Sequence, residues 1–296
     1  MSNLSKGNHP DKPVTISTDS ACDLVLPLRE EFSVAVLPLY INVEGEFFKD
    51  GVDIFPPDIF RIYEERGIIP KTAAASVGDY LSFFQQYTGQ GRAVVHVSLS
   101  SRLSSSFRNA MLAAAELEDV YVVDSLAFTV AQGMLTVQGC LLRDQGFTAR
   151  EVAARLEQLR HKIRAYFIVD KLDFLVKGGR CSAVNAFGAN LLSLRPSIVI
   201  NAQNGDLVVG KKYRGKLAAV QESFLRDCAA ASADFDPAML WCMHTPDMQP
   251  AQYEPLRHLA QELFPQVGRL VLGAITGCMI VSHCGKNCIA FVALEK

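Results

Sequence analysis

Short apolar runs alternate with amphipathic helical patterns along the first half of the chain. The clearest helical pattern follows residue 102, where apolar residues recur at spacings of four and three: Leu103, Phe107, Ala110, Ala114 and Leu117. Strands that alternate with amphipathic helices are typical of a parallel sheet covered by helices. The sequence predicts strands at four places in this half: 14–18, 34–43, 93–99 and 119–125.

A long helix is predicted to connect the two halves of the chain. It spans 148–163, where Thr148 and Glu151 form a capping-box pattern ahead of apolar residues at helical spacing. A strand-like run at 165–170 follows it directly. The pattern therefore indicates a domain boundary near residue 165.

The residue pattern changes in the second half of the chain. Its segment 196–212 predicts two strands that turn at Asn204-Gly205, a strong hairpin signal. We therefore predict an α/β protein with a parallel-sheet N-terminal domain, helices on both of its faces, and a C-terminal mixed-sheet α/β domain. The predicted ranges are 1–13 for a disordered N-terminal arm, 14–165 for the N-terminal domain and 166–296 for the C-terminal domain.

Charge and composition exclude several classes of partner. The 29 basic and 31 acidic residues give a net charge of −2. The chain therefore lacks the positive electrostatic field that would attract nucleic acid or an anionic membrane. The first thirteen residues lack the apolar centre of a secretory signal, and no run of apolar residues reaches the length of an integral membrane segment. We expect a cytoplasmic protein.

Eight cysteines lack any Cys-x-x-Cys pair and would stay thiols in a reducing compartment. The cluster Cys278, Cys284 and Cys288 suggests a metal site, but it lies in a segment that looks like a strand. We therefore interpret these residues as buried thiols and predict no metal.

Hydroxyl side chains gather where predicted strands end. The stretch VSLSSRLSSSFRNAM (97–111) has six serines in nine positions, and PKTAAAS (70–76) and STDSACDL (17–24) are further hydroxyl-bearing edges. Strand ends that lead into helices expose unpaired N–H groups and are common ligand sites. The plain alternative is one capping serine in a solvated loop. If the three edges converge, they form a binding site for an anionic group.

Other motifs are weaker. GDLVVGKK (205–212) nearly matches a phosphate-binding loop, but Lys212 replaces the required Ser or Thr and the intervening residues look like a strand. Serines with His283 and Asp124 are compatible with a serine hydrolase acting on an acyl ester, although no Gly-x-Ser-x-Gly elbow occurs. Asp124 is more simply an acid that ends a strand and caps the next turn. KGGR (177–180) is either an anion nest or a helix end followed by a solvated arginine.

Eight fragments in order resemble the motifs of the DegV family, from residue 14 to near the end of the chain. They are TDSACDL (18–24), KDGVDI (49–54), PKTAAAS (70–76), VSLSSRLSSSFRNA (97–110), VDSLAFTVAQG (123–133), LVKGGRCSA (175–183), GKKYRGKLAA (210–219) and VSHCGKN (281–287). The resemblance implies a fatty-acid-binding protein of two α/β domains with the acyl chain buried between them.

The resemblance also implies a carrier role rather than catalysis. Such a protein presents a long-chain fatty acid to a separate fatty acid kinase subunit, which makes acyl phosphate for phospholipid synthesis. It needs no cofactor besides the bound acid. The family pattern maps the carboxylate-binding role onto Thr72, Ser100, Ser101, Ser104 and His283. It maps basic positions near the pocket mouth and the partner's phosphate chemistry onto Arg180 and Arg214. A non-catalytic lipid-binding regulatory protein is a third possibility.

Some positions depart from the family pattern. Ala73–Ala75, Ser105 and Lys286–Asn287 replace residues usual in the family, which affects head-group geometry and chain preference rather than the fold. Each buried methylene contributes about 0.8 kcal/mol, so a long apolar tunnel would dominate affinity. The segments expected to form its wall are 187–194, 128–142 and 271–281. An ordinary core is the simpler interpretation of each, and the sequence does not separate a tunnel wall from a packed interior.

Overall fold

Four parallel strands form the first sheet of the protein. A computed structural model describes residues 12–181, 194–231, 234–265, 271–274 and 277–296. In this sheet the order is β2-β1-β6-β7, with bounds Ala35–Leu37, Val14–Asp19, Ala93–Ser98 and Val120–Asp124. β1 and β6 are almost entirely buried, as expected for parallel strands covered on both faces. The predicted parallel sheet is confirmed.

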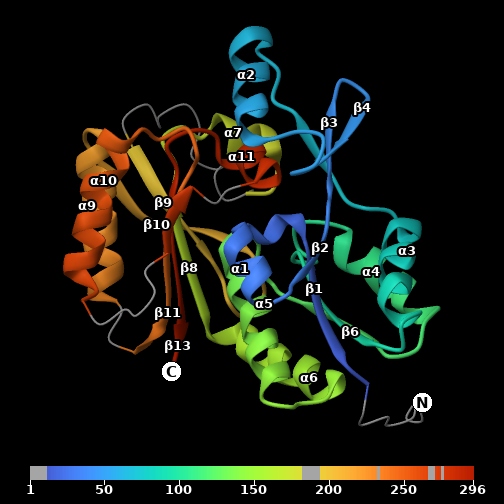
Figure 1. Ribbon diagram of the computed structural model, residues 1–296. Coiled ribbons are helices and arrows are strands. Elements are labelled where there is room, and N and C mark those ends of the chain that lie inside the picture. Colours follow the sequence, from blue (N-terminus) through green and yellow to red (C-terminus); the bar gives the residue numbers. More distant parts are fainter. Residues whose placement is uncertain (1–11, 182–193, 232–233, 266–270, 275–276) are drawn as a thin grey trace.

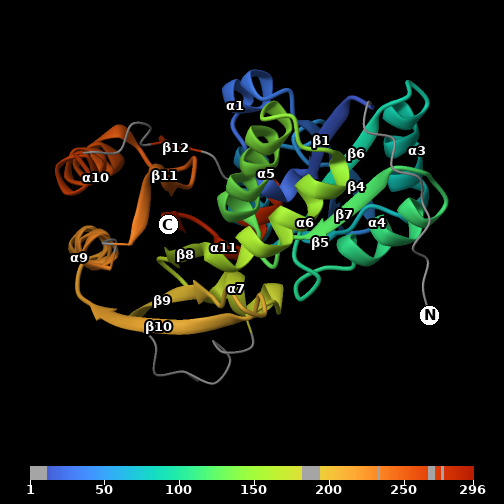
Figure 2. The ribbon, with the colours of Figure 1, turned by 90° about the horizontal axis from the view of Figure 1, so that it is seen from below.

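Helices cover both faces of this sheet (Figures 1 and 2). On one face lie α3 (Val77–Thr88) and α4 (Ser106–Ala115). On the other lie α5 (Thr129–Asp144) and α6 (Ala149–Leu159), and α5 also contacts the second large sheet. A short helix, α1 (Leu26–Glu31), follows the 3-10 turn η1 (Ser20–Cys22) at the end of β1.

The second sheet is mixed, as predicted. Its order is β10-β9-β8-β13-β11-β12, in which only β11 and β12 pair in parallel. The strands are β8 (Ile163–Ile168), β9 (Leu194–Ile200), β10 (Leu207–Arg214), β11 (Phe235–His244), β12 (Val271–Ala274) and β13 (Ile289–Glu295). The hairpin of β9 and β10 is confirmed, although its loop holds six residues, 201–206.

Two helices, α9 (Leu217–Ala230) and α10 (Pro250–Leu263), cover the outer face of the mixed sheet (Figure 2). They bury Phe224 and Leu256 against the strands. The inner face packs on α5 and α6, and this core joins Ile16 of the first sheet to Trp241 of the second. The layers therefore alternate as helices, sheet, helices, sheet and helices.

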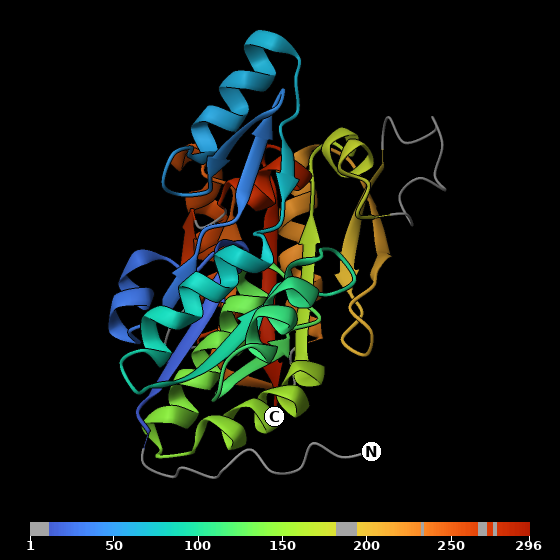
Figure 3. The same cartoon turned by 90° about the vertical axis from the view of Figure 1, so that its right-hand side faces the viewer.

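A third, three-stranded sheet stands apart from the two large ones and is not predicted by the sequence (Figure 3). Its order is β4-β3-β5, with bounds Glu46–Lys49, Tyr40–Val43 and Lys71–Ala73. The helix α2 (Pro56–Arg66) lies beside it. The single strand predicted at 34–43 is wrong: β2 ends at Leu37 because Pro38 has no N–H for a strand ladder, and β3 joins a different sheet.

Three further boundaries differ from the prediction. The helix expected over 148–163 ends at Leu159, since a 3-10 turn (Arg160–Lys162) leads directly into β8. The helix expected over 103–117 is the shorter α4. The segment holding Cys278 and Cys284 is a buried helix, α11 (Cys278–Cys284), and not a strand. The thiols are buried and free, as expected.

The helix α11 matters because it belongs to the second half of the sequence yet packs in the first. It contacts α2, β3, β5 and η1, as well as α7 (Asp173–Gly178). In Figure 1 it lies between the two large sheets. No helix in the described part of the chain combines the length and the apolar character needed to cross a bilayer. The domain limits set at 165 and 166 stay a prediction.

Candidate functional site

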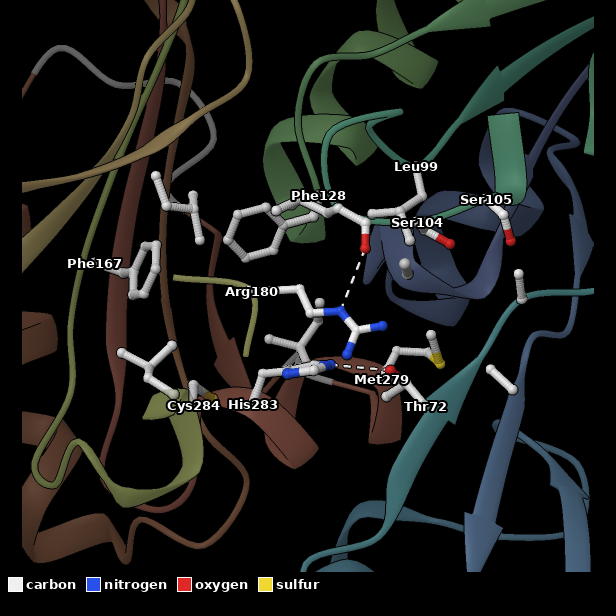
Figure 4. A pocket seen from close by; sticks show the side chains of 17 residues that line it. Thr72, Leu99, Ser104, Ser105, Phe128, Phe167, Arg180, Met279, His283 and Cys284 are labelled. Atoms are coloured by element: carbon white, nitrogen blue, oxygen red, sulfur yellow. Dashed lines mark hydrogen bonds between the residues drawn. The ribbon is translucent and has the colours of Figure 1, made fainter. Parts of the chain in front are cut away.

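A cavity of about 130 Å³ lies where the two halves of the chain meet (Figure 4). All three predicted edges reach it, through Ala21, Thr72 and Ser104, but the edge at 17–24 brings no hydroxyl to the lining. Its apolar lining comes from both halves: Leu99, Leu103, Phe128, Phe167, Leu175, Leu207, Met279 and Ile280. Its polar side chains are Thr72, Ser104, Ser105, Arg180 and His283.

The volume sets what the cavity can hold. An engineered apolar cavity of about 150 Å³ binds benzene. The space enclosed by the described residues therefore suits a polar head group and the first few carbons attached to it. A longer ligand would have to extend beyond this space. The predicted wall segment 187–193 lies outside the described residues.

Thr72 and His283 form the polar centre of the cavity. Thr72 lies on β5 and His283 near the end of α11, and Thr72 Oγ1 is 3.0 Å from His283 Nε2. Burial, and secondly the charge of Arg180, lower the pKa of His283 to about 4. The imidazole is therefore neutral at pH 7, and one of its nitrogens carries a hydrogen.

The surroundings of Nδ1 decide which nitrogen that is. Nδ1 of His283 is buried and has no hydrogen-bond partner, because it faces Gly178. A Cβ atom at Gly178 would lie only 2.2 Å from Nδ1, so this position accepts no side chain without displacing the ring. A buried N–H without an acceptor is rarer and costlier than an unpaired acceptor. We therefore assign the hydrogen to Nε2, which donates to Thr72 and leaves the threonine hydroxyl free to donate into the cavity.

Arg180 brings a positive charge to the same wall. It follows α7, whose C-cap Gly179 has a left-handed backbone (φ +67°). The sequence KGGR therefore ends a helix, as in the simpler of the two interpretations of this motif. Arg180 Nε donates to the carbonyl of Leu103 at 3.4 Å and its Nη1 to that of Gly178 at 2.9 Å. The side chain is nevertheless exposed, so the guanidinium faces both cavity and solvent.

The serine turn contributes fewer hydroxyls than the resemblance implies. Ser104 lines the cavity, and its Oγ accepts the N–H of Ser106 at 3.1 Å. Ser100 is fully buried outside the lining, and its Oγ accepts the N–H of Arg102 at 3.3 Å. Ser101 is exposed and also outside the lining.

Arg214 lies apart from the other predicted site residues. It is exposed at the end of β10, where it pairs with Leu194, and is not part of the cavity wall. The structure therefore brings together Thr72, Ser104, His283 and Arg180, and leaves Ser100, Ser101 and Arg214 outside the lining. The carboxylate contacts themselves stay a prediction for all of them.

The aromatic wall was only partly predictable. Phe128 and Phe167 both line the cavity and contact each other edge to face, with ring centroids 5.7 Å apart. Phe128 opens the predicted wall segment 128–142, but the rest of that segment forms α5, whose other residues are absent from the lining. Phe167 on β8 and Leu175 on α7 were missed, because an apolar residue facing a cavity has the same local pattern as one facing a core.

The contacts do not support the hydrolase or the phosphate loop. His283 bonds to Thr72 rather than to a serine. Asp124 Oδ1 accepts the N–H groups of Ser101 and Leu126, each at 3.1 Å, as expected of an acid that caps a turn. The segment 207–212 lies within the strand β10, so it is no loop preceding a helix.

Two solved structures resemble this fold closely. One, of a DegV family protein from Thermus thermophilus described as fatty acid binding, has 27% identity and a TM-score of 0.84 over 96% of this chain and 100% of that one. Another, described as a DegV lipid-binding protein from Thermotoga maritima, has 27% identity and a TM-score of 0.79 over 96% and 99%.

The sequence comparisons point to the same family. A DegV domain-containing protein from Clostridium acetobutylicum is 28% identical over 287 residues, which are 96% of this chain and 99% of that protein. The family model for DegV proteins matches residues 13–296. That match includes every described element and the whole cavity lining, and it confirms the resemblance drawn from the eight fragments. The chain belongs to the DegV family.

Proposed function

We propose that this protein binds a long-chain fatty acid in the cavity between its halves and presents the carboxyl group to a fatty acid kinase. The observation that carries the proposal is the composition of the cavity. A hydroxyl, a neutral imidazole and an arginine meet at one place, and apolar side chains from both halves surround them. The relatives from Thermus thermophilus and Thermotoga maritima, described as fatty acid and lipid binding, support this choice of ligand.

The head group is held by few but well-directed donors in this proposal. A carboxylate leaving water must be met by hydrogen bonds, and bonds to a charged acceptor are about twice as strong as neutral ones. The Thr72 hydroxyl donates because His283 Nε2–H occupies its acceptor side. Arg180 lies beside them and supplies the balancing charge. Since Arg180 is exposed, solvent screens it, and the acid can leave without stranding a buried cation.

The tail supplies the larger share of the affinity. A buried methylene contributes about 0.8 kcal/mol, so a sixteen-carbon chain gains roughly 10 kcal/mol before ordering costs are subtracted. Phe128, Phe167 and Leu175 would contact its first carbons. Ala73 and Ala74, which replace usual family residues, also line the cavity and make this edge more apolar.

Presentation to a kinase is supported by the space beside Arg180. A polar cavity of about 470 Å³ adjoins the first and shares Leu103, Arg180 and Leu207 with it. The carboxyl end would therefore be accessible to a phosphoryl donor held by the partner. We place this exchange in the cytoplasm, a reducing compartment in which the eight buried cysteines stay thiols.

Acyl phosphate formation tests the proposal. The protein is loaded with palmitic acid, incubated with a bacterial fatty acid kinase and ATP, and the acyl phosphate is captured by hydroxylamine as a hydroxamate. We expect hydroxamate only when the protein is present, and much less with Thr72→Val, while Asp227→Asn, far from the cavity, is the matched control. Palmitic acid binding without hydroxamate would leave a lipid-binding regulatory protein and contradict presentation. Absence of binding would contradict the whole proposal.

A further inference from the structure

Two buried carboxylates hold the helix that carries His283, although neither lines the cavity. Asp23 follows β1 and Asp50 follows β4, and they are 2% and 4% exposed. Both meet the first turn of α11. Asp23 Oδ1 accepts the N–H of Gly277 at 2.6 Å, and Asp50 Oδ1 accepts that of Cys278 at 3.0 Å. The fragments TDSACDL and KDGVDI thus meet at one point, 228 residues or more before the helix they hold.

These contacts suit the start of a helix. The first N–H groups of a helix have no partner within it, and the helix dipole favours negative charge there. Gly277 caps α11 and lies between the two acids: a Cβ atom on it would be 3.1 Å from Asp23 Oδ1 and 3.4 Å from Asp50 Oδ2. The glycine therefore lets both carboxylates approach the same helix end.

The second oxygen of each acid fixes another part of the first half. Asp50 Oδ2 accepts the hydroxyl of Ser20 at 2.9 Å, and Ser20 Oγ in turn accepts the N–H of Leu39 at 3.0 Å. Asp50 thereby ties α11 to η1 and to the chain entering the three-stranded sheet. That sheet carries Thr72, the partner of His283.

Asp23 reaches the aromatic wall as well. Its Oδ2 accepts the hydroxyl of Thr129 at 2.6 Å. Thr129 has a positive φ of 51°, which is a strained conformation for a β-branched residue, and strain of this kind persists only where the surroundings enforce it. Thr129 directly follows Phe128, whose ring lines the cavity. One carboxylate therefore sets the positions of two walls.

Filling the core does not require carboxyl groups at positions 23 and 50. Burial raises the pKa of Asp23 and of Asp50, and the hydrogen bonds that each carboxyl group accepts oppose this rise. A buried carboxyl group is costly unless its hydrogen bonds are all made. Apolar residues would fill the same space at less cost. What the two acids do, and apolar residues could not, is to link separate elements that line one cavity through hydrogen bonds.

We propose that Asp23 and Asp50 are positioning residues for the fatty acid site, acting through α11 and Thr129 without touching the ligand. This inference rests on the proposed function for its ligand, but not for its geometry. The two residues hold His283, Met279, Ile280 and Phe128 in place, and so maintain both the head-group donor and the apolar wall.

Two readouts test the positioning role. The first is the affinity for palmitic acid. The second is the nitrogen spectrum of the His283 imidazole, recorded by NMR without ligand, which reports the ring tautomer and its bond to Thr72. Asp50→Ala and Asp23→Ala should each weaken binding by about tenfold or more, the effect of an unmet polar group, and should shift the His283 signals. Asp50→Asn and Asp23→Asn keep an acceptor for the helix N–H and should restore both readouts to within about threefold of the parent affinity.

Controls separate positioning from general destabilisation. Val220→Ala loosens the core under α9, far from the cavity, and should lower the melting temperature without moving the His283 signals. Gly277→Ala keeps both acids but crowds them, so it should shift the signals even if the alanine variants of the acids do not fold. Unchanged affinity and unchanged His283 signals in the folded alanine variants and in Gly277→Ala would overturn the inference. If the parent protein binds no palmitic acid, the proposed function fails, while the His283 signals still decide the positioning role.

Discussion

His96 and His283 are chemically alike but have different surroundings. Each is a neutral imidazole with one hydroxyl partner and one nitrogen without a partner. His96 Nδ1 lies 3.1 Å from Ser17 Oγ, and burial lowers its pKa to about 3. His283 Nε2 lies 3.0 Å from Thr72 Oγ1, and its pKa is about 4. A shifted pKa with a hydroxyl partner is therefore no mark of a binding site by itself.

The difference lies in the surroundings of each pair. His96 is fully buried within β6, and the rings of Tyr80, Phe83 and Phe84 pack against it at centroid distances of 5.4, 6.3 and 5.3 Å. Its hydroxyl partner is also fully buried, so no ligand reaches the pair. His283 and Thr72 face a cavity and the charge of Arg180. A hydrogen-bonded histidine–hydroxyl pair can form a binding site only if the surrounding elements leave a cavity beside it.

The strongest test of this comparison replaces each histidine by alanine. His96→Ala removes a ring from a packed core and leaves Ser17 without its partner, so unfolding should lose about 3 kcal/mol of free energy. His283→Ala should cost about 1 kcal/mol of stability or less, but it should weaken palmitic acid binding at least tenfold. Chemical denaturation and calorimetric titration measure the two effects. Equal losses of stability with equal affinities would remove the distinction between the two histidines.

The hydroxyl partners should separate in the same way. Thr72→Val keeps the shape but removes the donor, and it should weaken palmitic acid binding by about 1–3 kcal/mol. Ser17→Ala removes the equivalent hydroxyl beside His96 and should lower stability without changing affinity. Titration calorimetry of both variants at pH 7 provides the measurement. A weaker affinity in Ser17→Ala that matches Thr72→Val would mean that the cavity is not the site.

Gly178 offers a smaller perturbation of the His283 side alone. A Cβ atom at this position would overlap Nδ1, so Gly178→Ala should displace the ring and reduce affinity by about tenfold, or 1.4 kcal/mol. Gly78→Ala is the matched control, because a Cβ atom there would be 3.7 Å from its nearest neighbour. Binding measurements on both variants decide the point, and an unaffected Gly178→Ala protein would contradict the close packing described here.

The smallest effect concerns protonation. Arg180→Gln removes a positive charge beside His283, so the pKa of His283 should rise from about 4 towards its ordinary 6.5, whereas that of His96 should not change. Because folding lowers the pKa of His283, its stabilising contribution is present above pH 6.5 and is lost as the pH falls towards 4. NMR titration of the two imidazoles measures this directly. A pKa of His283 that stays at about 4 in the variant would mean that burial alone sets it and would contradict the contribution of Arg180.

Local signals predicted the parallel sheet and the hairpin. Apolar periodicity defines β1 and β6, and Asn204-Gly205 marks the hairpin, because both depend on neighbouring residues. Contacts between residues far apart in the sequence could not be predicted from these local signals. The bond between Thr72 and His283 joins residues 211 apart, and nothing local shows that α11 is a helix lodged in the first half of the chain.

The candidate site was predicted as a set of residue types rather than as a geometry. Thr72, Ser104, Arg180 and His283 reach the cavity, but the resemblance alone did not show that Ser100 is buried away from it. Arg180 was assigned to the pocket mouth and the partner, yet its side chain also forms part of the cavity wall. Whether a serine points to a ligand depends on the turn that follows it, which sequence spacing does not define.

A crystal structure of the protein with palmitic acid tests the central claim most directly. The account predicts the carboxyl group within hydrogen-bond distance of Thr72 Oγ1 and beside Arg180, with the first carbons packed against Phe128 and Phe167. An acid bound elsewhere, or one whose carboxyl group points away from Thr72 and His283, would contradict it.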